Sequence, residues 1–301
     1  MTDFPVWLAF ALISPLFWGI THVLDSYCVD EVFDHPWVGA VTSGLCTLLV
    51  LPFLALGMFL EPVAPMPWNA VGLCVLAGII FMAGQIAYFY ALSLSESGIV
   101  AAYWNLIPLL LLMIGYLFFD EQLTQFQYLG CAVLIFSSVG FCLLDGNAES
   151  RWQSFWLMLF GVLCMSIYFL IQKKVFVFSP VYHVFLVSSL SIATAGLTPL
   201  LSPRRLKVFK HNWVRIRPAF GFLLAIEIAN LIALGTSQYA VSYGHPSLVS
   251  AVEGTIPAYA FLISMALYFV FRKYGEEEAR HHLLTKLFLV CVMAFGVWLV
   301  S

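Results

Sequence analysis

Residues 90–108 read YALSLSESGIVAAYWNLIP, and residues 239–257 read YAVSYGHPSLVSAVEGTIP. Seven of these nineteen aligned positions are identical, including the Ile-Pro pairs that end at Pro108 and Pro257. Each stretch leads from the end of one apolar segment through a short turn into the next apolar segment. The chain therefore repeats a unit at an offset of 149 residues and places a helix-breaking proline at the same point of both copies.

The composition excludes a water-soluble protein. Hydrophobic residues make up 62% of the 301 residues and charged residues 10%, with a mean hydropathy of +0.96. A soluble domain carries roughly 25% charged residues. A membrane-spanning helix needs about 20 mostly apolar residues. The segments that fit this template are residues 5–24, 36–60, 68–92, 98–119, 125–144, 153–172, 181–201, 218–241, 247–271 and 283–301.

These segments predict two units of opposite orientation. Each half of the chain contains five candidate spans, and an odd number makes the second half enter the membrane from the other side. Inverted repeats of this kind are the plan of many secondary transporters. We expect an all-α integral membrane protein with ten transmembrane helices in two inverted five-helix repeats, residues 1–148 and 149–301. Two unrelated five-helix stretches with similarly placed prolines are the alternative.

Two stretches carry a resemblance to a known family. ALISPLFWGITHV, with its Trp18-Gly19 pair, is similar to the opening helix of EamA-type proteins of the drug/metabolite transporter superfamily. The segment from Tyr90 to Phe141 resembles the most recognisable part of these proteins. Its matching positions are Glu121, Leu123, Thr124, Gln127 and Gly130. The resemblance implies ten spans and a transport function, whereas FRKYGEEEARHHLLTK in the second half is longer and more charged than the family pattern.

The two prolines predict interruptions in the fourth and ninth spans. Because proline has no N–H, Pro108 and Pro257 should free the carbonyl groups of Trp104 and Glu253. An unpaired carbonyl group facing lipid costs several kcal/mol, so we expect both to face a cavity. Helices that merely bend around their neighbours are the alternative.

Two acidic residues are predicted well inside spans. Glu253 lies in the ninth span and Glu227 near the middle of the eighth. A charge at this depth costs about 3 kcal/mol on insertion scales, so it should face water, a partner or the bundle interior. Either carboxyl group could bind a cation or exchange a proton, or be a paired group without a transport role. Asp25 and His22 end the first span, where we expect them at the membrane interface.

Polar and aromatic side chains gather in the spans around these acids. Trp104 and Glu253 occupy equivalent positions of the two repeats, so an aromatic wall would lie opposite a carboxylate. That pair suits a substrate with an amino group and an apolar body. For Asn and Gln side chains, hydrogen bonding between helices is the alternative. The predicted substrate-binding residues are Gln85, Tyr88, Tyr103, Trp104, Asn105, Tyr168, Glu227, Asn230, Gln238 and Glu253.

These features predict a secondary transporter that takes up or exports a small organic metabolite, an amino acid or an amine-bearing compound. Known metalloprotease, serine hydrolase and ATP-binding motifs are absent from the sequence, so we expect no enzyme activity and no cofactor. The tract 276–282, EEEARHH, lacks regular ligand spacing, and the seven cysteines lie mostly in spans; we expect no metal site. A membrane-embedded binding or assembly subunit, or a flippase for a lipid-linked substrate, is the alternative.

The expected partners are the lipid bilayer and a small-molecule substrate, without nucleic acid. Substrate exchange or a proton gradient would drive transport, and a monomer and a homodimer are both open. MTDFPVW lacks a basic region and a cleavage site, which predicts a multi-pass protein of the cytoplasmic (inner) membrane without a cleaved signal peptide. All thirteen Lys and Arg residues follow Ser150, six of them in residues 202–217. Positive charge favours the cytoplasm, which predicts both termini outside, whereas the family is usually drawn with both inside.

Overall fold

The computed structural model describes residues 5–56, 66–95, 100–101, 103–118, 123–144, 148–271 and 283–300. Every regular element in these ranges is a helix. Glu121 and the tract 276–282, both considered above, lie outside the described residues. The elements are α1 (Val6–Glu31), α2 (Trp37–Ala55), α3 (Trp68–Leu92), α5 (Leu106–Phe118), α6 (Gln125–Leu144), α7 (Ala148–Val175), α8 (Val181–Gly196), η2 (Thr198–Leu201), α9 (Pro203–Tyr243), α10 (Pro246–Glu253), α11 (Ile256–Phe271) and α12 (Leu283–Val300).

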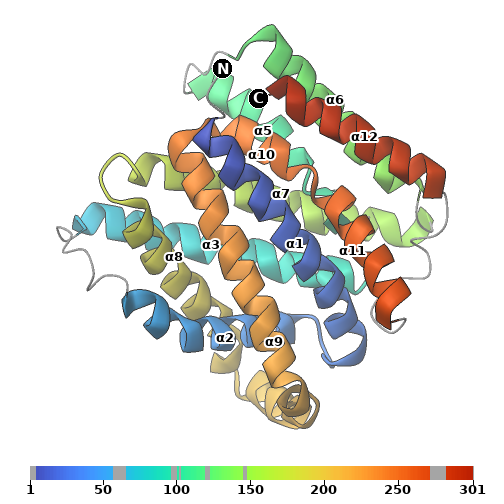
Figure 1. Cartoon of the computed structure of the whole chain (residues 1–301). Coiled ribbons are helices and arrows are strands. Elements are labelled where there is room, and N and C mark those ends of the chain that lie inside the picture. Colours follow the sequence, from blue (N-terminus) through green and yellow to red (C-terminus); the bar gives the residue numbers. More distant parts are fainter. Residues whose placement is uncertain are drawn as a thin grey trace.

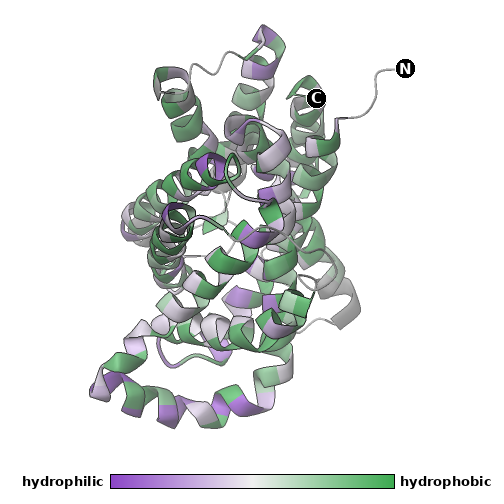
Figure 2. Cartoon of the chain, turned by 90° about the vertical axis from the view of Figure 1, so that its left-hand side faces the viewer, coloured by the Kyte–Doolittle hydropathy of each residue, from purple (hydrophilic) through white to green (hydrophobic). Residues whose placement is uncertain are grey.

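The described helices confirm an all-α membrane protein. Eight stretches among the described residues are long and apolar enough to cross a membrane, with α10 and α11 together forming one of them. α5 and α6 fall on the two remaining expected spans, 98–119 and 125–144. Apolar residues predominate along the bundle (Figure 2), and outward side chains such as Phe53 and Phe136 are each 75% exposed. Such a surface suits lipid, while the count of ten spans stays a prediction.

Proline marks the beginning of several helices. Pro5, Pro36, Pro67 and Pro180 immediately precede α1, α2, α3 and α8. α9 and α10 have proline as their first residue. The fixed φ angle of proline suits the first turn of a helix, where its missing N–H would have no partner within the helix. These prolines therefore set where the chain re-enters the bundle after each turn.

Several helices are longer than the hydropathy pattern predicts, and α1 and α9 show the largest extensions at one end. α1 continues past the expected end at residue 24 to Glu31, and α9 begins at Pro203 rather than near residue 218. Both extensions contain polar residues, whose low hydropathy predicts a loop. They remain helical because helix formation needs only backbone bonds and one packed face, whatever the polarity of the other face.

The helices pack in matched pairs. α1 lies along α9, and α3 lies along α7; α2 packs on α8, and α6 packs on α12 (Figure 1). If two related five-helix units exchanged places, α1 would become α7 and α3 would become α9. The first two pairs would then exchange, and each of the last two would map onto itself. These pairings fit two related five-helix units, while the inverted repeat and its boundary at residues 148 and 149 stay predictions.

Glycines allow the closest of these approaches. A Cβ atom at Gly44 of α2 would lie 2.6 Å from the carbonyl oxygen of Ala193 in α8. Reciprocally, a Cβ atom at Gly196 of α8 would lie 2.7 Å from the carbonyl oxygen of Ala40 in α2. Small residues of this kind allow membrane helices to pack through their backbones. At the α2–α8 crossing, a glycine of each helix thus lies against a backbone carbonyl group of the other helix.

Candidate functional site

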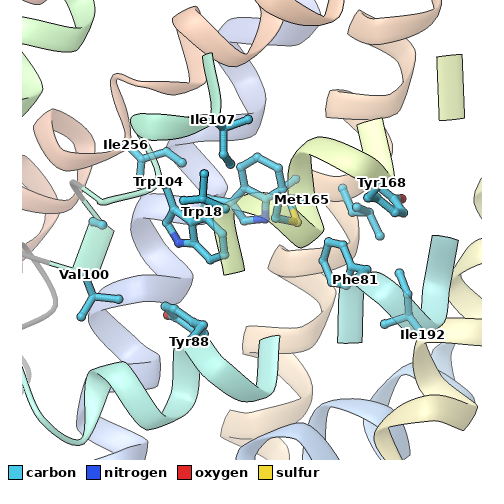
Figure 3. Packing of buried hydrophobic residues seen from close by; sticks show 14 of the residues in the cluster. Trp18, Phe81, Tyr88, Val100, Trp104, Ile107, Met165, Tyr168, Ile192 and Ile256 are labelled. Carbon is cyan, nitrogen blue, oxygen red and sulfur yellow. The ribbon is translucent and has the colours of Figure 1, made fainter. Parts of the chain in front are cut away.

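A cavity lies at the centre of the bundle, where both halves of the chain contribute its wall. It contains about 900 Å³ of empty space, part of it open to the surroundings. α1, α2, α3, α7, α9 and α10 line it, together with the turns that precede α5 and α11. Figure 3 shows Ile107 and Ile256, from the first turns of α5 and α11, gathering near Trp18 and Trp104. The cavity therefore lies where the two repeated Ile-Pro stretches meet.

The ninth expected span is interrupted beside this cavity. α10 ends at Glu253, and Gly254 and Thr255 form a turn before α11 begins at Ile256. The turn is closed by short-range bonds, from Thr255 N to Val252 O (3.0 Å) and from Ala258 N to Thr255 O (2.9 Å). Pro257 is then the second residue of α11, where a missing N–H leaves no intrahelical bond unmade.

A similar turn precedes α5 in the first half. Trp104 and Asn105 form it, and Pro108 falls in the first turn of α5. The expectation of a free carbonyl group at Trp104 is wrong, because Ile107 N donates to Trp104 O at 2.9 Å. The bond from the N–H group of Ile107, which spans three residues, thus replaces the bond that Pro108 cannot donate. The side chain of Trp104, rather than its carbonyl group, faces the cavity.

The two interruptions pack against each other. A Cβ atom at Gly254 would lie 2.4 Å from Oδ1 of Asn105 and 2.7 Å from the carbonyl oxygen of Ala251. Both Asn105 and Gly254 are therefore part of one close contact between the first and second halves. Glycine is required here because any larger residue would displace a buried amide.

Glu253 is held at the cavity by α1. Its side chain is only 5% exposed, and Ser14 Oγ donates to Glu253 Oε1 at 2.8 Å. Ser14 directly precedes Pro15, inside α1. Sequence reasoning missed Ser14 because a single serine in an apolar span has no pattern that distinguishes it from packing residues.

Glu227 lies in a separate hydrogen-bonded group of the same cavity. Thr47 Oγ1 of α2 donates to Glu227 Oε1 at 2.6 Å, and Asn230 Nδ2 donates to the same oxygen at 3.3 Å. Asn230 Oδ1 in turn accepts a bond from Trp18 Nε1 at 3.3 Å. This group ties α1, α2 and α9 together and fixes the indole of Trp18 against the cavity.

A third group joins α1 to α3 through Tyr88. The hydroxyl of Tyr88 donates to Asp25 Oδ2 at 3.2 Å and lies 2.7 Å from His22 Nδ1. Which of His22 Nδ1 and the Tyr88 hydroxyl donates in this contact depends on the tautomer of His22. His22 and Asp25 line the cavity, while their expected position at the membrane interface stays a prediction.

Six of the ten predicted binding residues line the cavity: Gln85, Tyr88, Trp104, Glu227, Asn230 and Glu253. The other four lie elsewhere. Tyr168 of α7 accepts a bond from Gln238 Nε2 of α9 at 2.5 Å, so this pair joins two helices. Tyr103 packs edge-on against Phe155, with ring centroids 5.7 Å apart, and Asn105 lies against Gly254.

The described lining of the cavity is acidic and aromatic. It contains three carboxyl groups, from Asp25, Glu227 and Glu253, beside His22, and among the described residues no Lys or Arg lines it. Lys173, near the end of α7, donates to Val241 O at 2.9 Å and Gly244 O at 2.8 Å. The aromatic lining residues are Trp18, Phe33, Tyr88, Phe89, Trp104 and Phe169. The described lining thus combines carboxyl groups with aromatic faces and has no Lys or Arg side chain.

The chain is similar to known proteins in sequence and in overall fold. Residues 5–143 match the profile of the EamA-like transporter family. Residues 5–143 are thus similar to an EamA-like transporter domain. The resemblance to EamA-type proteins of the drug/metabolite transporter superfamily is thereby confirmed. Helices α1, α2, α3 and α5, which line much of the cavity, lie within this EamA-like domain.

Two further proteins are similar to the chain. An uncharacterized transporter of Archaeoglobus fulgidus is 25% identical over 124 residues, which are 41% of this chain and 43% of that protein. The match thus spans less than half of the relative's length. A protein of known crystal structure shares the fold, with a TM-score of 0.66 over 96% of this chain and 98% of that one, at 15% identity. The fold therefore extends beyond the EamA-like domain to nearly the whole chain.

Proposed function

We propose that this protein is a secondary transporter of a small, amine-bearing organic compound, which it moves by alternating access around the central cavity. One observation carries the proposal: three carboxyl groups and six aromatic side chains line the cavity, and no described Lys or Arg balances the charge. A protonated amine supplies the missing positive charge. Its apolar body would lie against the aromatic rings, whose faces attract cations.

The same charge balance ranks the candidate substrates. An amino acid brings a carboxylate, which needs a cationic or N–H partner inside the cavity. The described lining offers N–H groups such as those of Gln85, Trp104 and Trp18, the last of which already donates to Asn230, but no Lys or Arg. An amine without a carboxylate meets no such demand. We therefore place amines and other organic cations ahead of amino acids.

The helix interruptions support a mechanism of alternating access. Two inverted five-helix units would rock around a site at their interface, as in other transporters with this plan. The matched helix pairs, α1 with α9 and α3 with α7, would supply the moving surfaces. Glu253 ends α10 at the interruption, so a change in the angle between α10 and α11 would move its carboxyl group relative to Ser14. Substrate exchange or a proton carried by these carboxyl groups would drive the cycle.

The test is counterflow in proteoliposomes of the purified protein. Vesicles loaded with an unlabelled arylalkylamine should accumulate the labelled amine transiently and saturably. A carboxylic acid with the same aromatic body should give no accumulation, and a zwitterionic amino acid should give less than the amine. Preference for the anion, or no exchange of any amine by folded protein, would refute the proposal. The assay also separates a carrier from a binding or assembly subunit, because only a carrier exchanges substrate.

A further inference from the structure

The beginning of α9 is a separate feature from the cavity. α9 has 41 residues, so at about 1.5 Å per residue it is about 60 Å long. The hydrocarbon core of a bilayer is only about 30 Å thick. Figures 1 and 2 show the part of α9 before Pro218 crossing the lower end of the molecule, at the end opposite the N- and C-termini. We call residues 203–217 the basic segment.

The basic segment is fixed to the turn between α1 and α2. Asn212 Nδ2 donates to Val32 O at 3.1 Å, and Asn212 Oδ1 accepts from Asp34 N at 3.4 Å. Asp34 also forms an ion pair with Arg215 at 3.1 Å. Phe209 and Ile216 are buried on the same side as Asn212. One face of the segment is therefore used to pack against the bundle.

The remaining surface of the segment carries a high positive charge. Its six Lys and Arg residues are Arg204, Arg205, Lys207, Lys210, Arg215 and Arg217, and all are exposed. The segment has no acidic residue of its own. Among the described residues, the pair of Arg215 with Asp34 is the one ion pair of this surface, and Arg205 lies over the ring of Trp37 at 5.9 Å. Most of these basic side chains thus have no acidic side chain as an ion-pair partner among the described residues.

We propose that the basic segment binds the headgroups of anionic phospholipids. The segment crosses the end of the bundle, and a 15-residue helix of about 22 Å presents several cations along the membrane surface. Lipid phosphates are always present there, and clusters of Lys and Arg next to a spanning helix attract anionic lipids. Trp213 and Val214 are exposed on the same segment, and such apolar residues can enter the interfacial layer beside the charges. The packed face, through Asn212, would hold the cations in place.

The test counts lipids bound to the whole protein. Purified protein in detergent is mixed with phosphatidylglycerol or phosphatidylcholine of the same acyl chains, and bound lipid is counted by native mass spectrometry. We expect at least about tenfold tighter binding of phosphatidylglycerol, since each basic residue near an anionic surface contributes about fivefold. The triple variant Arg204→Gln/Lys207→Gln/Lys210→Gln should lose most of this preference. Raised salt should reduce it as well, because exposed charges are screened.

Two control variants keep the result interpretable. Lys207→Arg/Lys210→Arg retains the charge and should retain the preference. Lys174→Gln removes an exposed charge at the end of α7 and should leave the preference unchanged. Circular dichroism of the triple variant checks that its helices remain. Equal binding of both lipids by the original protein, or a preference that survives in the folded triple variant, would overturn the proposal. Tighter binding of polyglutamate than of either lipid would assign the surface to an acidic protein and also overturn it.

Discussion

Replacing Glu253 by Gln should weaken the binding of a cationic substrate without unfolding the protein. Gln has nearly the size of Glu and still offers an oxygen to Ser14 Oγ, which now donates to Glu253 Oε1 at 2.8 Å. The hydrogen bond between α1 and α10 can therefore survive the substitution. The change removes one ionisable carboxyl group from a cavity in which no described Lys or Arg supplies a fixed counter-charge.

The expected loss can be worked from that geometry. A hydrogen bond between an amine and a charged partner contributes about 1.5 to 3 kcal/mol. Because each 1.4 kcal/mol is a factor of ten, the Kd for an amine should rise about 10- to 100-fold. Asp25 and Glu227 keep the cavity acidic, so binding should be weakened rather than abolished. A neutral molecule with the same apolar body should be affected much less.

Binding is measured by isothermal titration in detergent, and exchange by counterflow in vesicles. Glu31→Gln is the matched control, because it removes the same charge from an exposed position at the end of α1. Its Kd should equal that of the original protein. An unchanged Kd in folded Glu253→Gln would show that the carboxyl group does not contact the substrate. The same result would remove the main support for an amine substrate.

Four further outcomes follow from the described contacts. Gly254→Ala should lower the stability by about 1 to 3 kcal/mol, because its Cβ atom would lie 2.4 Å from Asn105 Oδ1; thermal unfolding checks this. Lys173→Met should lower the unfolding temperature, since about 2 kcal/mol of charged hydrogen bonding to the carbonyl groups of Val241 and Gly244, at the end of α9, is lost. Asp25→Asn should retain counterflow but lose uphill uptake driven by a pH gradient, if this carboxyl group carries the coupled proton; unchanged uphill uptake would exclude that role. Lys207→Cys should react with an impermeant thiol reagent only after cells are opened, because basic segments favour the cytoplasm.

Sequence patterns predicted the helices of the bundle better than their ends. The expected spans 68–92 and 125–144 coincide with α3 and α6, because long apolar runs bounded by proline or polar residues leave little choice of boundary. The end of α1 and the beginning of α9 were placed in loops. Hydropathy cannot distinguish a polar loop from a helix whose polar side faces water or a cavity. Those two extensions contain Asp25 and the basic segment.

The candidate site was predictable where a residue type is rare in a membrane. Glu227 and Glu253 could be identified because a carboxyl group inside a span needs a protein-lined or wet environment, and both line the cavity. For polar residues without a charge, the sequence could not tell a side chain that faces the cavity from one that bonds to a neighbouring helix. Tyr168 and Gln238 bond to each other, whereas Gln85 faces the cavity, and only three-dimensional packing decides between these outcomes. The hydrogen bond from Ser14 to Glu253 of α10 became evident only from the structure.

The contact of Asn105 with Gly254 makes a single joint of the two interrupted helices. The amide of Asn105 fills the space that the missing side chain of Gly254 leaves. If the two interruptions act as hinges in the proposed transport cycle, we expect a motion of one to be accompanied by a motion of the other. A leak, with both sides of the membrane connected at once, would require these two hinges to move independently, and this contact opposes such movement.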